Sequence, residues 1–460
     1  MAFSGTARAA MSAMSMLTLL AAMPALADGT DASGASSPSN AAAPLLILGD
    51  IGGLRPKLAA YGLTPALVET DEILGNVSGG VRRGMIFEGL TDISLALDLR
   101  PQLHWRGNFF VRAYQIHGKG LSADNIDNLN TISGNEATAT TRLFELWYEQ
   151  RVSDWLRIRI GEQSAGAEFL LSTVAKSFVN GAFGWPTLAA ADLPAGGPNY
   201  PLATPGLRFR VDASDALTFF AGVFNGNSAG PGPGDPQQRD PSGTAFRVND
   251  GAFAIYEFRY NPGNLATNAT YKFGGWYNSE RFADLRLDTN EMSLASPATS
   301  GVPRQHTGNF SFYAIIDQPL FGGSVGDHGW AMFGRIMGAP GDRNLVDTYA
   351  DGGLTYKNGD PNWFGQTGDT VGMAVAYARI GGAARALAAD TASFGTQPYP
   401  HRTSETVFEL TYQIGLIPGW QVQPDLQYVL NPGGGIPNPQ SPPGRIRNAV
   451  IGGLRTTLNF

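Results

Sequence analysis

Apolar and polar residues alternate along most of the chain, which is the period of an extended strand with two different faces. The segment DISLALDL (92–99) has isoleucine or leucine at every second position and aspartate, serine or alanine between them. The segments WLRIRIG (155–161) and GLRFRVD (206–212) repeat the pattern with arginines on the polar face. An amphipathic helix would instead repeat every three to four residues. The chain is therefore predicted to be all-β.

About sixteen segments of this kind follow one another along the chain. They begin near residues 66, 89, 107, 141, 154, 204, 215, 250, 268, 308, 328, 350, 369, 404, 419 and 445. Short turns alternate with long loops rich in glycine, proline, asparagine and aspartate. The turns are 152–154, 213–215, 261–264 and 417–419, and the long loops are 117–140, 163–203, 225–249, 279–307 and 381–403. Two further turns, 100–106 and 357–368, are longer than the others on their side.

This sorting of connections by length is typical of an outer-membrane barrel, which has short periplasmic turns and long outer loops. A secreted β-sandwich or propeller also alternates apolar and polar residues. It would not regularly place arginine and glutamate opposite strands that end in aromatic residues. It would also not place its long loops at one end and its short turns at the other. We therefore predict a transmembrane antiparallel β-barrel of about sixteen strands, with both chain ends on the periplasmic side.

The first residues have the pattern of an export signal. Arg8 precedes a run of small residues, leucine and methionine (9–22), and Ala25–Ala27 fits the small-x-small rule for cleavage. We expect residues 1–27 to be a signal peptide and residues 28–44 to be a low-complexity linker. The alternative is a buried N-terminal helix.

Composition narrows the class of protein further. The chain has no cysteine, so its stability must come from a large fold or a membrane rather than from disulfides. A formal charge of −7 argues against a nucleic-acid partner, which needs a basic surface. After the N-terminal segment no stretch is long and apolar enough for a transmembrane helix. These features exclude a helical membrane protein and leave the barrel.

Motifs for catalysis or metal binding are poor. The string GNSAG (226–230) matches a nucleophile elbow, but the proline-rich PGPGDP follows where a helix would have to begin. The histidines, at 104, 117, 306, 328 and 401, show no ligand spacing. We expect no enzyme activity, no cofactor and no metal site.

The polar faces of the strands carry charged and aromatic side chains that would face the barrel lumen. They are Arg112, Glu145, Trp147, Glu149, Arg157, Arg159, Arg208, Arg210, Glu257, Arg259 and Trp276. They could be polar simply because water fills the pore and opposite charges pair across neighbouring strands. They could also form a sugar path, because a pyranose packs its C–H face on a ring while its hydroxyls bond to charged groups. Weak, repeated sites of that kind allow passage without trapping.

The segment RLFELWYEQR (142–151) gives the clearest separation of the two faces. Strict alternation puts Phe144, Leu146 and Tyr148 on the lipid side and Glu145, Trp147 and Glu149 on the lumen side. All three members of the second set are candidates for the sugar path.

The chain ends on VIGGLRTTLNF (450–460), an amphipathic strand whose last residue is phenylalanine. We expect this strand to pair with the first and close the barrel, so that no edge is left in lipid. Leu454, Leu458 and Phe460 would then face the bilayer, with Phe460 in the periplasmic aromatic girdle. Arg455 would face the lumen. Such a C-terminal aromatic resembles the signal read by the barrel-assembly machinery.

Several motifs together resemble the carbohydrate-selective porin family of Gram-negative outer membranes. They are LGDIGGLRPKLAAYGL (48–63), GNVSGGVRRG (75–84), HGKGLS (117–122), TRLFELWYEQ (141–150), AVAYARI (374–380) and GLRTTLNF (453–460). The similarity runs from about Leu48 to Phe460, and the ordered set is specific although each motif alone is weak.

The resemblance implies a monomeric porin through which glucose and other mono- and small oligosaccharides diffuse down a gradient, with no cofactor. Outer-membrane lipid and the barrel-assembly machinery would be its other partners. Residues 45–65 would include a short helix at the periplasmic mouth, before the barrel of residues 66–460. The family's sugar path carries over only to Glu145, Trp147 and Glu149.

Three points stay open at this stage. The loop 162–190 lacks the cysteine pair expected in some relatives, so how it is held in place is not evident. The chain would instead be a general or anion-preferring diffusion porin if the positive charge of the arginines, rather than the aromatic rings, decides which solutes the pore favours. A barrel that exports a polysaccharide would need a partner domain, which the sequence does not show.

Overall fold

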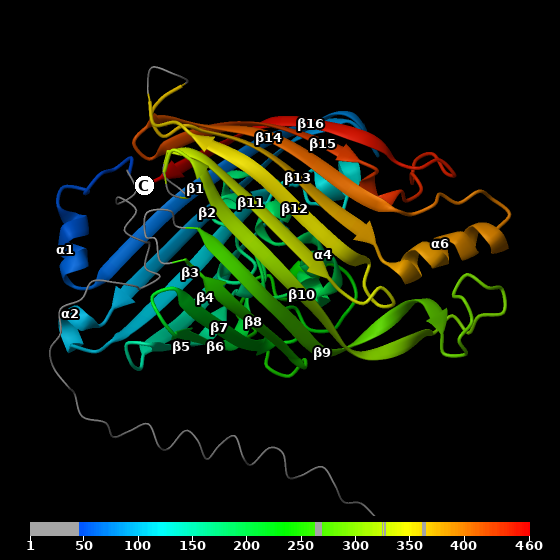
Figure 1. Ribbon diagram of the computed structural model, residues 1–460, viewed down its shortest axis with the longest axis horizontal. Helices are drawn as coiled ribbons and strands as arrows, with labels where there is room; N and C mark the ends of the chain where they lie inside the picture. The colour runs from blue at the N-terminus through cyan, green and yellow to red at the C-terminus, as the bar shows by residue number, and fades with distance from the viewer. Residues whose placement is uncertain (1–45, 263–268, 324, 326–327, 361–364) are drawn as a thin grey trace, which may run out of the picture. The chain divides into compact units, whose positions relative to one another are not determined.

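Sixteen antiparallel strands form a closed barrel in which each strand is hydrogen-bonded to its sequence neighbours and β1 to β16 (Figure 1). The computed structural model describes residues 46–262, 269–323, 325, 328–360 and 365–460. The prediction of an all-β barrel of about sixteen strands is confirmed. The segments predicted as signal peptide (1–27) and linker (28–44) lie outside the described residues.

The strands start within five residues of the predicted positions. They are β1 (Leu63–Gly80), β2 (Gly84–Asp98), β3 (Gly107–Gly118), β4 (Thr140–Arg151), β5 (Leu156–Gln163), β6 (Thr204–Asp212), β7 (Leu217–Asn225), β8 (Ala252–Tyr260), β9 (Thr270–Asp288), β10 (Pro303–Phe321), β11 (Gly329–Gly338), β12 (Val346–Lys357), β13 (Thr370–Ile380), β14 (Ser404–Ile417), β15 (Trp420–Leu430) and β16 (Arg447–Asn459). Long and short connections alternate between the two ends, called here the long-loop end and the short-turn end. Two connections are exceptions, since β1–β2 (81–83) and β11–β12 (339–345) are short and lie at the long-loop end.

The helices are short and lie outside the strands; α1 precedes β1, and the others lie in the connections. They are α1 (Leu54–Ala60), α2 (Arg100–Leu103), η1 (Ser122–Ile126), η2 (Ala165–Ala167), η3 (Ala175–Ser177), α3 (Gly181–Gly184), α4 (Thr187–Asp192), η4 (Pro194–Gly196), α5 (Pro236–Arg239), α6 (Gly382–Phe394) and η5 (Pro432–Gly434). Among the described residues, no helix has both the length and the apolar character needed to cross a bilayer.

The passage from α1 into the barrel is a tight turn at Gly62. Its φ of 78° is in the left-handed region that favours glycine, and a Cβ there would overlap the carbonyl oxygen of Asp98. Leu63 already pairs with Leu97 of β2. The barrel therefore starts at Leu63, slightly before the predicted boundary at residue 66.

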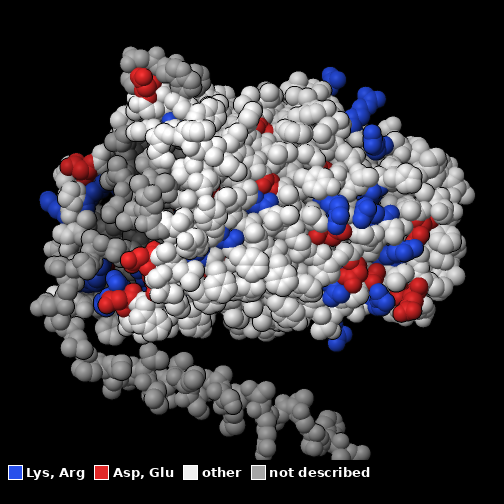
Figure 2. All heavy atoms as spheres, viewed as in Figure 1, with Lys and Arg blue, Asp and Glu red and all other residues white. Residues whose placement is uncertain are grey.

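The outer wall shows the predicted alternation. On β14, Phe408 and Leu410 are 45% and 50% exposed, whereas Val407 is fully buried on the inner side. On the face in Figure 2, much of the wall is uncharged, and charged side chains gather mainly toward the end with α6 and the β9–β10 hairpin. An apolar band bounded by polar ends is what a bilayer requires of a barrel.

Two connections fold into the barrel and fill much of its interior. The first inner segment (residues 164–203) links β5 to β6, and Figure 1 shows its helix α4 inside the barrel. Its Phe178 ring lies 5.8 Å from the Phe333 ring of β11. The second inner segment (residues 119–139) links β3 to β4, and its Ile132 is fully buried. The apolar core of this protein therefore lies inside the barrel, between the wall and these two segments.

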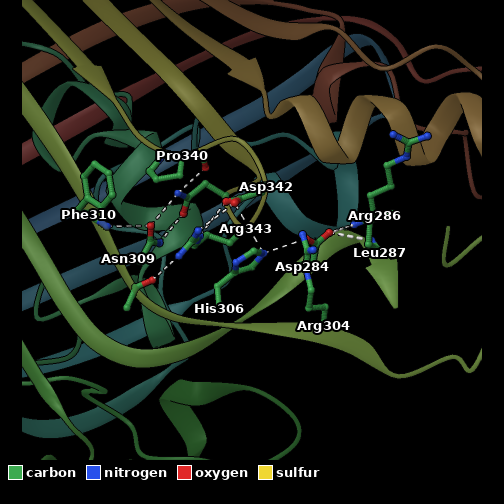
Figure 3. Close-up of polar contacts among 12 residues, drawn as sticks. Asp284, Arg286, Leu287, Arg304, His306, Asn309, Phe310, Pro340, Asp342 and Arg343 are labelled. Carbon is green, nitrogen blue, oxygen red and sulfur yellow. Dashed lines mark hydrogen bonds and ion pairs between the residues drawn. The ribbon is translucent and has the colours of Figure 1, made fainter. Parts of the chain in front are cut away.

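A buried carboxylate ties the β9–β10 hairpin together at the long-loop end (Figure 3). Asp284 of β9 is 2% exposed and lies 2.8 Å from the Arg304 guanidinium and 2.9 Å from Nε2 of His306, both on β10. It also accepts hydrogen bonds from the backbone N–H groups of Arg286 and Leu287. These contacts link the two strands of the hairpin at its long-loop end.

Replacing Asp284 with asparagine should loosen this hairpin. The change removes a buried charge from its cationic partners and should lower the local opening free energy by about 2–3 kcal/mol. Native-state hydrogen exchange of β9 and β10 amides measures this. Glu291→Gln is the matched control, because Glu291 is 77% exposed and 3.5 Å from Arg304, and it should change protection little. Equal protection in both variants would contradict the role of Asp284.

Candidate functional site

Arg335 of β11 holds the first inner segment from one side of the lumen. Its guanidinium donates hydrogen bonds to the carbonyl oxygens of Leu170 (2.6 Å), Ala182 (2.8 Å) and Gly184 (3.1 Å). It also forms an ion pair with Asp351 of β12, and both side chains are fully buried. Because the segment has little regular structure, its backbone groups need such partners.

Carboxylates on other strands hold the same segment by its N–H groups. Asp317 of β10 accepts a hydrogen bond from the N–H of Thr173 (3.0 Å). Glu409 of β14 accepts from the N–H groups of Val179 (2.6 Å) and Asn180 (2.9 Å). These carboxyl oxygens satisfy backbone N–H groups of the segment that would otherwise be buried without a partner. They show how the segment is held without a disulfide.

Several of the residues predicted to line the pore belong to this anchoring system. Glu257 accepts a hydrogen bond from the N–H of Leu170 (3.1 Å), and Arg259 donates to the carbonyl oxygen of Glu168 (2.6 Å). Arg208 contacts Glu149 of β4 and Glu168 of the inner segment, each at 2.6 Å. Arg159 lies 3.0 Å from Glu149 and 3.7 Å from Glu168. Burial tends to raise the pKa of Glu168, but the Arg208 and Arg159 guanidiniums outweigh it and hold this pKa below its usual value. The charges of this network are thus matched within it.

Arg112 and Glu145 occupy a neighbouring stretch of the inner wall. Arg112 lies 2.9 Å from Asp92 of β2 and 3.6 Å from Glu145. Glu145 also accepts a hydrogen bond from the N–H of Ser164 (3.2 Å), where the inner segment begins. Arg112 is partly exposed, whereas Glu145 is buried.

The remaining predicted charges are also paired on the inner wall. Arg157 and Arg210 share Asp212, at 3.6 Å and 2.8 Å. Glu257 and Arg259 pair at 2.5 Å. Each arginine of the predicted set therefore has a carboxylate within 4 Å.

The two predicted tryptophans pack against other groups. Trp147 stacks on Phe110 with a centroid distance of 4.9 Å, and the Arg159 guanidinium lies 3.9 Å from its ring centroid. Trp276 is buried, 6.1 Å from the Phe253 ring. The structure thus brings the predicted site residues to the inner face, and their part in the sugar path stays a prediction.

Phe144 does not face lipid as strict alternation predicts. It is 3% exposed and packs on Tyr114 with a centroid distance of 4.6 Å. The reason is a β-bulge, since Arg112 pairs with Glu145 whereas the next residue, Ala113, pairs with Leu143. A bulge adds one residue to a strand and reverses the side-chain parity beyond it.

A cavity of about 370 Å³ lies between the two inner segments and the wall. Its polar lining side chains are Thr131, Ser133, Asn135, Glu136, Lys176, Asn180, Thr187, Asn199 and Arg455, and its aromatic ones are Phe178, Trp185 and Tyr200. None of the eleven residues predicted to line the pore is among them. Pockets for small molecules usually enclose about 300–1,000 Å³, so this space suits a solute the size of a monosaccharide.

Glu136 is the acidic group of this cavity. Burial raises its pKa to about 7, although hydrogen bonds from Ser122 lower it and the nearby Glu72 adds to the rise. Ser122 donates to the Glu136 carboxylate through its N–H (3.0 Å) and its hydroxyl (2.8 Å). Glu136 therefore changes charge near neutral pH, in a cavity whose other charged lining side chains are Lys176 and Arg455.

Ion selectivity should depend on this group. Above pH 7 the Glu136 carboxylate is charged and favours cations. Below pH 7 it is protonated, so that the positive charge of Lys176 is no longer balanced by Glu136, while Arg455 stays paired with Glu72. We expect the preference to shift toward anions between pH 8 and pH 6, as measured by reversal potentials in planar bilayers. The Glu136→Gln variant should show a much smaller shift, whereas the exposed Asp154→Asn, at the short-turn end, should behave like the unmodified protein. An unchanged shift in Glu136→Gln would contradict this assignment.

The barrel closes between β16 and β1, as the sequence predicts. The predicted closure residues Leu454, Leu458 and Phe460 lie on β16 or directly after it. Leu454 is 45% exposed on the outer side and pairs with Ile73 of β1. Arg455 points inward, forms a 2.6 Å ion pair with Glu72, and lines the cavity. The role of Phe460 in assembly stays a prediction.

The anchors Asp317, Arg335 and Glu409 are not among the residues predicted from the sequence. Arg335 shares its face of β11 with Phe333 and Met337, which are 2% exposed. Both faces of this strand are therefore apolar, since one meets lipid and the other meets the inner segment. Alternation could not identify the inner face here. An arginine inside an apolar strand was the available signal.

Comparison with known proteins agrees with this geometry. The model of the family described as "Carbohydrate-selective porin, OprB family" matches residues 82–460. The chain belongs to this family. Porin B of Pseudomonas aeruginosa is 23% identical over 438 residues, which cover 90% of this chain and 91% of that protein.

Solved structures of OprB from Pseudomonas putida have the same fold. The high-pH structure has a TM-score of 0.79 at 22% identity and covers 91% of this chain and 99% of its own. The low-pH structure has a TM-score of 0.55 at 16% identity and covers 90% and 98% of the two chains. The OprB family consists of carbohydrate-selective channels of the Gram-negative outer membrane, so the predicted family, location and carbohydrate transport are confirmed.

Proposed function

We propose that this OprB-family porin passes monosaccharides such as glucose through the cavity between its two inner segments. The observation that carries the proposal is the lining of this cavity. Tyr200 lines it together with the amide residues Asn135 and Asn199 and the charged residues Glu136 and Lys176. An aromatic ring packs against the C–H face of a pyranose, and amide and charged groups form hydrogen bonds with its hydroxyls. Weak contacts of this kind let the sugar pass without being held tightly.

The charge balance of the wall favours a neutral solute over an anion. The arginines of the predicted set are paired with carboxylates, so they leave little uncompensated positive charge. Arg112, Arg210 and Arg259 keep 30%, 21% and 22% of their side chains exposed. We propose that Arg112 and Arg210 lie along the approach to the cavity, while Glu149, Arg159, Arg208 and Arg259 support the inner segment.

Liposome swelling tests the selectivity. We expect liposomes containing the protein to swell faster in glucose than in a neutral amino acid of similar size, because only the sugar matches the ring and amide lining. Protein-free liposomes give the baseline. Equal rates for the two solutes would overturn the sugar-selective proposal and leave a general diffusion porin.

The other partners stay predictions from the sequence. We expect a monomer, inserted into lipid by the barrel-assembly machinery through its C-terminal aromatic residue. Uptake is favoured over polysaccharide export, because the inner segments leave a space sized for small solutes.

A further inference from the structure

The outer wall carries a polar cluster that the pore does not use. Glu69 and Asp71 of β1 lie on the same face as Ile73, which is 50% exposed to the outside. His117 of β3 has the parity of the outward Phe109. The side chains of Glu69, Asp71 and His117 are only 21–30% exposed. Two carboxylates on a membrane-facing wall need a compensating charge.

The three side chains converge on one point. His117 Nε2 lies 3.2 Å from Oδ1 of Asp71 and 3.8 Å from Oε1 of Glu69, and the three potential ligand atoms lie within 4.8 Å of one another. Tetrahedral zinc with bonds of about 2.0–2.1 Å needs ligand atoms about 3.3 Å apart. Two of the separations, 3.2 Å and 3.8 Å, are close to this value, and the third is at most 4.8 Å.

Two further features shape the cluster. Gln115 Oε1 lies 2.9 Å from Nδ1 of His117, and in the tautomer in which Nδ1 donates to this oxygen, the Nε2 lone pair faces the carboxylates. Metal-binding histidines are usually oriented by such a second contact. Gly89 of β2 lies between the two strands, and a Cβ there would overlap both Nε2 of His117 and Oδ1 of Asp71. Because Gly89 has no side chain, it leaves the space in which the ligand atoms meet.

The cluster lies near the outer boundary of the apolar band. His117 is eight residues along β3 from Phe109, which packs on Tyr148 at the short-turn end. At about 3.4 Å per residue and a tilt of about 40° this is about 20 Å along the membrane normal, in a band about 25 Å tall. A cation can reach this height from water.

We propose that Glu69, Asp71 and His117 bind a divalent transition-metal cation of the zinc class on the outer wall. One imidazole and two carboxylates suit zinc better than magnesium, which prefers oxygen ligands alone. The cation cancels the two negative charges and links β1 to β3 beside the strand pair that closes the barrel. The separation of the ligands, with one at 117 and two at 69 and 71, explains why the sequence shows no ligand spacing.

Zinc titration of the mature protein tests this. The untagged, chelator-treated protein in detergent should bind one Zn²⁺ per chain by calorimetry, and Mg²⁺ should not replace it. His117→Gln and Asp71→Asn should each weaken zinc binding at least tenfold. Gly89→Ala keeps all three ligands but should weaken zinc binding similarly, because its methyl group fills the space between them. His401→Gln, at an exposed histidine elsewhere, is the matched control and should bind as the unmodified protein does.

Folding of each variant is checked by heat-dependent electrophoretic mobility, so that lost binding in a folded barrel is informative. Absence of zinc binding by the unmodified protein would overturn the proposal. So would unchanged affinity in both His117→Gln and Gly89→Ala.

Discussion

Replacing Arg335 with alanine should raise the single-channel conductance at least twofold. The buried guanidinium donates to four carbonyl oxygens of the first inner segment and pairs with Asp351. Its removal leaves a buried carboxylate without its partner, which typically costs about 3–5 kcal/mol. The segment should then leave the lumen for part of the time, which widens the pore. Conductance in planar bilayers measures this, and block by glucose should weaken in parallel.

Arg379→Ala is the matched control for this variant. Arg379 of β13 also pairs with an aspartate, Asp347 at 2.7 Å, but it is 46% exposed and contacts no carbonyl of the inner segment. Exposed pairs contribute about 0–1 kcal/mol, so conductance should stay as in the unmodified protein. An unchanged conductance in folded Arg335→Ala would show that this anchor does not set the width of the pore.

Replacing Tyr200 with leucine should weaken glucose block of the ion current about fivefold. The ring lines the cavity and packs on Tyr114 at 5.4 Å, and its hydroxyl donates to the carbonyl of Asn135 at 2.9 Å. Leucine keeps apolar packing but removes the flat face. A loss of about 1 kcal/mol, the usual size of an aromatic contact, corresponds to about a fivefold change in affinity.

The Trp147→Ala variant distinguishes a sugar path through the cavity from the sugar path predicted by the sequence. Trp147 lies between Phe110 and Arg159 and is not among the cavity-lining residues. If the cavity is the path, Trp147→Ala should weaken glucose block less than Tyr200→Leu. If the order is reversed, the sugar path follows the residues predicted by alternation, and the cavity is not its narrowest part.

The fold could be predicted well because a barrel strand has a strict period. Lipid on one side and polar groups on the other require alternation in nearly every strand. The prediction fails where a second element reverses this rule. Phe144 turns inward at a β-bulge, and Phe333 is apolar on the inner face because the inner segment covers it.

The candidate site was less accessible from sequence. Arg112, Glu145 and Arg208 were placed correctly on the inner face by parity, but parity says nothing about which of them meet solute. Glu136 and Tyr200 lie in connections, where no period exists. Only packing of the two inner segments against each other brings them together.

The sequence by itself determined the barrel, its strand number, its closing strand and its family, since each depends on local alternation or on contiguous motifs. The tertiary structure decided what fills the lumen and which groups line the cavity between the two inner segments. It also decided that Glu69, Asp71 and His117 share one point on the outer wall. The physical reason is the same in each case. Strand period is a property of neighbouring residues, whereas ion pairs, cavities and ligand sets depend on which strands and loops the closed barrel brings within a few ångströms.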